Sequence, residues 1–230
     1  MPLHTKTVVA DYLYSHSHFL HSSLVQCETL YQQNFGFSCV IVLFNCLENV
    51  ARSAINDYES KLSAVFTSLY TKGYITEKEH DFLNKGDFCL RVIRNKYTHK
   101  NAAAINFVLQ NDGRDELWPL TENDTSLMLY CKISDIVFNL MIKIVSAGYI
   151  DSVREKFNVP LDSYIDKCNL QYRILTAKEL LALKGYPEDY IPDDLLIPED
   201  AKLRIVDCAP DLNISLPFYS KIADTLKNKE

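Results

Sequence analysis

The stretch SCVIVLFNCLENVARSAINDYESKLSAVFTSLYTK, residues 38–72, settles the fold class because it contains neither glycine nor proline. Each of those residues destabilises the interior of a helix. Its apolar residues recur at three- and four-residue steps, the spacing of a helix with one buried face. They are Val40, Phe44, Leu47, Val50, Ala51, Ala54, Tyr58, Leu62, Val65, Phe66 and Leu69. The stretch predicts one long central helix ending at Lys72 and Gly73, where glycine readily forms a left-handed cap.

Further helices are predicted on both sides of this central one. A capping box of Thr76 and Glu79 begins a short helix that ends near Asn84. Gly148 is expected to end the last long helix. The expected helices cover residues 11–33, 76–84, 88–109 and 125–147, with a loop at 111–120. This order predicts an all-α bundle of four or five helices with short connections.

The composition changes after about residue 157. Five of the eight prolines lie between positions 187 and 217, with short helical signals between them. We therefore predict a helical domain at 1–157 and a small, mainly helical C-terminal module at 158–230. The module contains an acidic run: Glu188, Asp189, Asp193, Asp194, Glu199 and Asp200. Such a run is usually a solvated surface, although it can also mimic phosphates and cover a basic face.

The overall composition is that of an ordinary soluble globular protein, with 47% hydrophobic and 23% charged residues. The net charge of −6 argues against a protein that coats nucleic acid through bulk electrostatics. The start shows no secretory signal, and the apolar run from Val40 to Phe44 is too short for a bilayer. We expect a cytoplasmic protein with no membrane contact, no cofactor and reduced cysteines, because the seven cysteines show no Cys-x-x-Cys spacing.

Cationic side chains concentrate in RVIRNKYTHKN, residues 91–101. Histidine titrates near neutrality and moves protons, and a guanidinium stabilises charge that grows on a phosphate. Arg94, Asn95 and His99 are therefore the candidate catalytic residues for phosphodiester cleavage. Neighbouring cations are the candidates for substrate binding: Arg91, Lys96 and Lys100.

Carboxylates do not cluster in this stretch, which argues against a magnesium-dependent nuclease and predicts no metal site. RNA supplies its own nucleophile, the 2′-hydroxyl beside each phosphate. One base, one acid and a phosphate clamp then suffice. Because the stretch has a single histidine, the simplest second group is the same helix of another subunit, which predicts a homodimer.

At Arg94-Asn95-Lys96-Tyr97-Thr98-His99 the chain resembles the HEPN superfamily, whose ribonucleases have an Arg, a polar residue, three variable residues and His in a helical bundle. The resemblance covers residues 1 to about 150. It implies a metal-independent endoribonuclease of a toxin–antitoxin, abortive-infection or other antiviral system, with an antitoxin or regulatory protein as a partner. It also implies a supporting polar residue on a neighbouring helix, for which Glu48 and Asn49 are the candidates.

Two alternatives remain open at this point. Some HEPN-like domains bind RNA, nucleotides or proteins without cutting, which makes a catalytically silent scaffold module the competing hypothesis. Alternatively, Arg94 and His99 form a solvated helix face with ordinary salt bridges.

A second stretch, residues 173–190, resembles the end segment of cytosine-5 DNA methyltransferases. Thr176 and Glu179 also form an ordinary capping box there, and Gly185 is expected to end the helix. We expect no methyl transfer, because the chain shows neither a glycine-rich cofactor loop nor a Pro-Cys nucleophile. His16, His18 and His21 are likewise expected to be structural.

Overall fold

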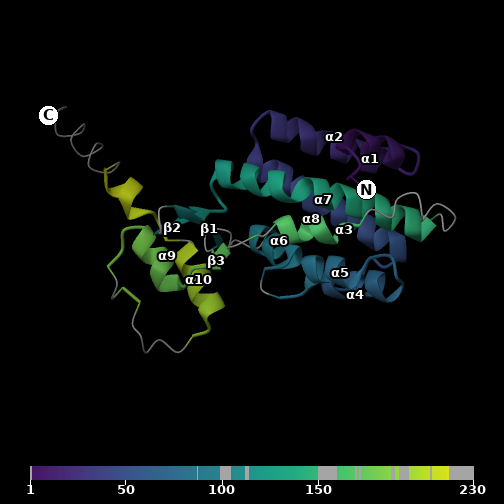
Figure 1. The fold of residues 1–230 in the computed structure, drawn as a ribbon. Helices are drawn as coiled ribbons and strands as arrows, with labels where there is room; N and C mark the ends of the chain where they lie inside the picture. The colour runs from purple at the N-terminus through teal and green to yellow at the C-terminus, as the bar shows by residue number, and fades with distance from the viewer. Residues whose placement is uncertain are drawn as a thin grey trace.

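A computed structural model of the 230-residue chain shows a mostly helical protein with one small sheet (Figure 1). Helices make up most of the chain, as the long glycine-free intervals predicted. The structure describes residues 2–86, 88–98, 105–111, 114–149, 160–168, 170, 172–187, 190–191, 197–207 and 209–217.

Two parallel neighbours, α3 (Gly36–Ile55) and α7 (Asn123–Tyr149), form the centre of the bundle. Helix α2 (His18–Gln32) packs on α3, and α1 (Lys6–Tyr14) packs on α2 and α7. The predicted helix at 11–33 is therefore wrong in its extent, because Ser17 caps the start of a new helix. Its side chain accepts a hydrogen bond from the Leu20 amide.

The predicted single helix over 38–72 is interrupted. Helix α3 ends at Asn56, whose φ of 55° and ψ of 45° are left-handed, and α4 (Leu62–Thr71) begins six residues later. Asparagine tolerates this conformation better than most residues, so it ends the helix without a glycine. Gly73 follows α4 with a φ of 70°, as predicted.

The capping box at Thr76 is confirmed at the start of α5 (Glu77–Asn84). The Glu79 side chain is fully buried, and its carboxylate accepts hydrogen bonds from Lys143 Nζ at 2.7 and 2.9 Å. This ion pair joins α5 to α7. Helix α6 (Leu90–Thr98) follows and contacts α5 and α3.

The expected helix at 88–109 and loop at 111–120 are both wrong in part, since the chain forms a sheet there. Strand β1 (Ile105–Asn111) pairs antiparallel with β2 (Arg114–Pro119) and with β3 (Tyr172–Ile174), giving the order β2-β1-β3. The fully buried Ile105 side chain joins the bundle core.

Glycine does not end the last long helix, because α7 continues past Gly148 to Tyr149. A Cβ at Gly148 would lie 3.1 Å from the Cβ of Ala54, so this glycine lies where α7 approaches α3 closely. The prediction that Gly148 stops the helix was therefore wrong.

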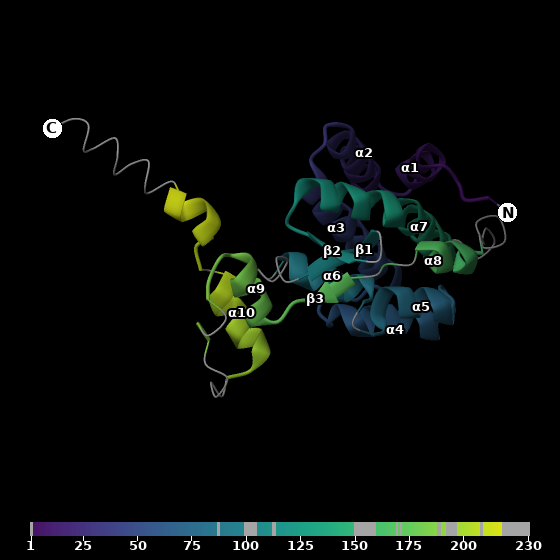
Figure 2. The same ribbon diagram turned by 60° about the vertical axis from the view of Figure 1, so that its left-hand side comes forward.

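The chain has two hydrophobic cores, and the boundary between them lies later in the sequence than expected. Helix α8 (Asp162–Cys168) supplies Cys168 to the main core, and Leu161 belongs to it as well. Helices α9 (Ala177–Leu183) and α10 (Glu199–Asp207) form a separate small core beside the sheet, at one end of the bundle (Figures 1 and 2). The division between the cores falls near Leu175 rather than at residue 157.

By length and apolar composition α3 is able to cross a membrane, although a helix at the core of a soluble protein meets the same criterion. In this fold its buried face packs against α2 and α7, which supports a soluble protein. The six described cysteines are free, and all except Cys131 are buried.

Candidate functional site

Helix α6 presents the RVIRNKYT stretch with one buried face and one partly exposed face. Leu90, Ile93 and Tyr97 point into the core, since they are at most 5% exposed. This anchoring leaves Arg94 and Asn95 on the partly exposed side. Helix α6 ends at Thr98, and the predicted site residues His99 and Lys100 lie outside the described residues.

Arg94 is held by a carboxylate from the central helix. Its Nη2 donates to Glu48 Oε2 at 2.6 Å, and the two side chains are only 24% and 17% exposed. Glu48, one of the two expected supporting residues, therefore contacts the motif from a neighbouring helix. The Arg94 Nε is buried and has no hydrogen-bond partner among the described residues.

A second guanidinium shares the same carboxylate. Arg52, one turn after Glu48 on α3, donates from Nε to Glu48 Oε1 at 2.9 Å. Sequence reasoning missed Arg52, although acidic and basic residues four apart on a helix form a recognised pairing signal. Two arginines around one carboxylate leave one net positive charge at this contact between α3 and α6.

Arg52 also fixes the loop that follows α3. Its Nη1 donates to the backbone carbonyls of Asp57 at 3.4 Å and Ser60 at 2.9 Å. Hydrogen bonds from the side chain and the backbone amide of Ser60 lower the pKa of Asp57, so this carboxylate stays ionised across the neutral range. The loop is therefore held at both of its ends.

Asn95 receives the other arm of the Arg94 fork. Arg94 Nη1 donates to Asn95 Oδ1 at 3.2 Å, so the guanidinium bends toward Asn95. An Arg94 fork held between Asn95 and Glu48 has a fixed direction, and fixed donors stabilise developing charge better than mobile ones.

The predicted substrate-binding residues have different surroundings. Arg91 donates from Nε to Asn84 Oδ1 at 2.8 Å and from Nη2 to the Asn84 carbonyl at 3.3 Å. These hydrogen bonds join the end of α5 to α6, so two of the Arg91 donors stabilise the fold. Lys96 is partly exposed on α6.

The end of α6 is positioned by Tyr97. Its hydroxyl donates to the Leu120 carbonyl at 3.3 Å and lies 2.9 Å from Ser126 Oγ. Burial raises the pKa of Tyr97 to about 12, so the hydroxyl keeps its proton and remains a donor. The C-terminal end of α6 is therefore fixed to α7 and to the turn that precedes α7.

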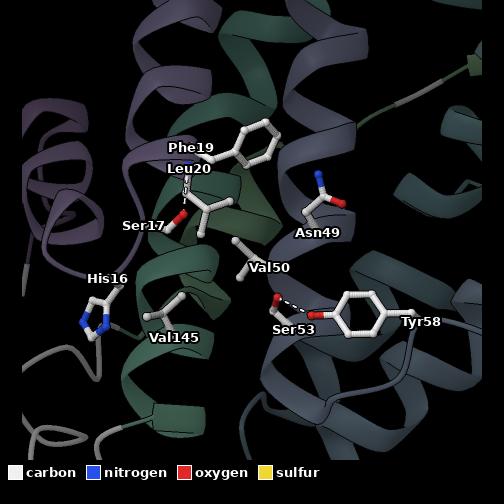
Figure 3. Close-up of a pocket in the computed structure, with 9 residues that line it drawn as sticks. All are labelled: His16, Ser17, Phe19, Leu20, Asn49, Val50, Ser53, Tyr58 and Val145. Carbon is white, nitrogen blue, oxygen red and sulfur yellow. Dashed lines mark hydrogen bonds between the residues drawn. The ribbon is translucent and has the colours of Figure 1, made fainter.

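Asn49 does not join Arg94. It faces a different hollow, the α2–α3 pocket, which has a volume of about 490 Å³ (Figure 3). The pocket is lined by His16, Ser17, Phe19, Leu20, Asn49, Val50, Ser53, Tyr58 and Val145. Of the two expected supporting residues, only Glu48 reaches the motif.

No group of three or more metal-binding side chains occurs within the described part of the chain, including the neighbourhood of Glu48. The three histidines near α2 do not gather around a common point for a metal either. His21 Nδ1 lies 3.0 Å from the Ala10 carbonyl, while His18 packs on Tyr14 at a ring distance of 4.2 Å. Together, the side chains of Arg94, Arg52 and Glu48 form a fixed, partly exposed positive site, which can bind a phosphate.

The capping box at Thr176 is confirmed in α9, and Gly185 follows that helix with a φ of 84°. From the acidic run, Glu199 accepts a hydrogen bond from the Ala177 amide at 2.6 Å, which is a structural contact within the small core. Glu188, Asp189, Asp193 and Asp194 lie outside the described residues.

Comparison with known proteins gives no relative: no family model, no curated protein and no solved structure matches this chain.

Proposed function

We propose that the chain is a metal-independent endoribonuclease with its centre at the C-terminal half of α6. The observation that supports this most is the 2.6 Å contact between Arg94 and Glu48. It joins the two features that the HEPN resemblance implies, an Arg-Asn-x-x-x-His stretch and a polar partner on a neighbouring helix. The surrounding bundle, which is mostly helical, fits the same proposal.

In this mechanism the 2′-hydroxyl of the RNA attacks the adjacent phosphorus, and the bond to the 5′-oxygen breaks. The products are a 2′,3′-cyclic phosphate and a 5′-hydroxyl. His99 takes or returns the proton, Arg94 stabilises the charge on the phosphate oxygens, and Asn95 keeps the Arg94 fork in place. Lys96, Lys100 and the remaining donors of Arg91 bind neighbouring phosphates.

The proposal includes a homodimer, because each chain offers one His99 and the reaction needs both an acid and a base. It places the protein in the cytoplasm, in a toxin–antitoxin, abortive-infection or other antiviral system with an antitoxin or regulatory partner. RNA is the substrate, and no cofactor takes part.

A second candidate is a catalytically silent binding module of the same fold. The engagement of Arg94 by Glu48, and of Arg91 by Asn84, favours it, because these bonds use guanidinium donors that a phosphate would need. The second candidate binds RNA, a nucleotide or a protein, and only the first candidate predicts new RNA ends.

The deciding experiment incubates the purified protein with RNA in EDTA and identifies the product ends. An identical RNA with 2′-O-methyl groups is the control, since it has no nucleophile. We expect cleavage of the first RNA only, with 2′,3′-cyclic phosphate ends. Loss of cleavage in EDTA, or cleavage of the methylated RNA, would exclude the proposed chemistry, and binding without cleavage would establish the silent module.

A further inference from the structure

The α2–α3 pocket is a hollow that the candidate ribonuclease centre does not use. Its volume of about 490 Å³ lies within the range of small-molecule sites, roughly 300 to 1,000 Å³. Its inner surface is apolar, with Leu20, Val50 and Val145 from three different helices. Its nine described lining residues include His16 but no Asp, Glu, Lys or Arg, so the pocket suits an uncharged part of a ligand.

Two aromatic rings border the opening. Phe19 from α2 is 64% exposed, and Tyr58 from the loop after α3 is 59% exposed. Figure 3 shows the two rings at opposite ends of the pocket, with Asn49 and Ser53 of α3 between them. Exposed aromatic faces stack well on a planar ring and cover it from water.

One polar group in the pocket remains available. The Asn49 side chain is exposed and has no hydrogen-bond partner within the described part of the chain, whereas Ser53 Oγ lies 2.9 Å from the Tyr58 hydroxyl. Ser17 Oγ caps α2. A side-chain amide has both donors and an acceptor, which pair with the adjacent acceptor and donor atoms on the edge of a base.

The ring of Tyr58 is held in position before any ligand binds. Arg52 fixes the carbonyls on either side of it, at Asp57 and Ser60, and the Tyr58 hydroxyl is bonded to Ser53. A pre-positioned ring loses little freedom on binding, which favours affinity. Because Arg52 shares Glu48 with Arg94, the same carboxylate supports this loop and the candidate centre.

We propose that the α2–α3 pocket binds a nucleobase that lies between the rings of Phe19 and Tyr58 and is recognised at its edge by Asn49. The base comes either from a free nucleotide or from a single RNA strand. The proposal goes beyond ribonuclease activity, because none of its three recognition residues belongs to the Arg94 and His99 stretch.

Isothermal titration calorimetry on the full chain tests it with AMP, GMP, CMP and UMP, and with ribose 5-phosphate as the base-free control. A 2′-O-methyl oligoribonucleotide of mixed sequence forms the second arm, since it cannot be cleaved by 2′-hydroxyl attack. We expect at least one base-bearing probe to bind and ribose 5-phosphate not to bind. Binding of mononucleotides alone identifies a free nucleotide as the source, and tighter binding of the oligonucleotide identifies a strand.

Phe19→Ala and Tyr58→Ala should each weaken binding by about five- to a hundredfold, the usual effect of removing one stacking ring. Phe19→Trp should keep affinity within about threefold, because a ring remains. Asn49→Ala should change the order of preference among the four bases. Phe35→Ala is the matched control, because Phe35 is 54% exposed and lies outside the pocket lining.

The proposal is overturned if no base-bearing probe binds to the folded protein, or if ribose 5-phosphate binds as well as AMP. It is also overturned if Phe35→Ala weakens binding as much as the two ring variants. RNA cleavage in EDTA is measured separately on His99→Ala, so failure of the pocket and failure of the ribonuclease are distinguishable.

Discussion

Glu48 is the residue on which the candidate site depends, since its single carboxylate pairs with two arginines that are each less than a quarter exposed. Glu48→Gln leaves Arg52 and Arg94 close together without a counter-charge, so we expect a loss of about 1–3 kcal/mol in the free energy of unfolding. Urea titration measures this free energy of unfolding. Glu59→Gln, at an exposed position in the next loop, should change the value by less than about 0.5 kcal/mol.

A second buried carboxylate gives a larger expected effect. Glu79 is fully buried and pairs with Lys143, which is 13% exposed. Lys143→Met removes its counter-charge, so we expect a loss of about 3–5 kcal/mol. The exposed pair of Lys78 and Asp166 provides the control, since Asp166→Asn should cost less than about 1 kcal/mol. Equal losses in the two variants would contradict the account of Glu79.

The sequence allowed only part of the candidate site to be predicted. The six-residue pattern located Arg94 and Asn95 because it is local in sequence, whereas Glu48 was suggested only by the family resemblance. The degree of burial of Arg94, whose side chain is 24% exposed, could not be predicted, since burial depends on which helix packs against α6. Asn49 was misplaced because a one-residue step on α3 turns a side chain about 100° around the helix axis.

At the scale of elements, α3 and α7 approach each other closely at Gly36. A Cβ there would lie 2.3 Å from the Asn123 carbonyl oxygen and 2.8 Å from the Leu127 nitrogen, both backbone atoms. Gly36→Ala must therefore push the helices apart, and we expect a loss of about 1–3 kcal/mol or more, despite the better helix propensity of alanine. Ser38→Ala, exposed one half-turn later, is the control and should have little effect. Unchanged thermal stability of Gly36→Ala would show that the contact is looser.

The elements that were predicted correctly are those with signals in their own sequence. The capping boxes at Thr76 and Thr176 and the left-handed Gly73 are local, and all three are present. Strand β1 was taken for a helix because its pairing with β3 joins residues nearly seventy positions apart. The Asp112-Gly113 pair between the paired residues Asn111 and Arg114 was the available hairpin signal.

At the scale of the whole molecule, the two cores predict where the chain can be shortened. A chain ending at Thr176 keeps Leu161, Cys168 and β3, so we expect a soluble protein that unfolds cooperatively at nearly the full-length temperature. A chain ending at Pro160 loses them all and should be at least about 2 kcal/mol less stable. Calorimetry compares the two.

The shorter folded chain also tests the role of the C-terminal module. Because it lacks the acidic run, we expect it to cleave RNA as fast as the full chain or faster, with altered selectivity. Insolubility of the chain ending at Thr176 would mean that the small core is required for folding, and slower cleavage would mean that it contributes to the reaction.

The central claim is that the end of α6 cleaves RNA, and the most direct measurement is the single-turnover cleavage rate in EDTA of three variants beside the unaltered chain. The account predicts that His99→Ala and Arg94→Ala each lower the rate by at least about a hundredfold, while remaining folded by circular dichroism. Lys178→Ala on α9, far from α6 in sequence, should retain the full rate. A His99→Ala protein that is folded and cleaves at the unaltered rate would contradict the account.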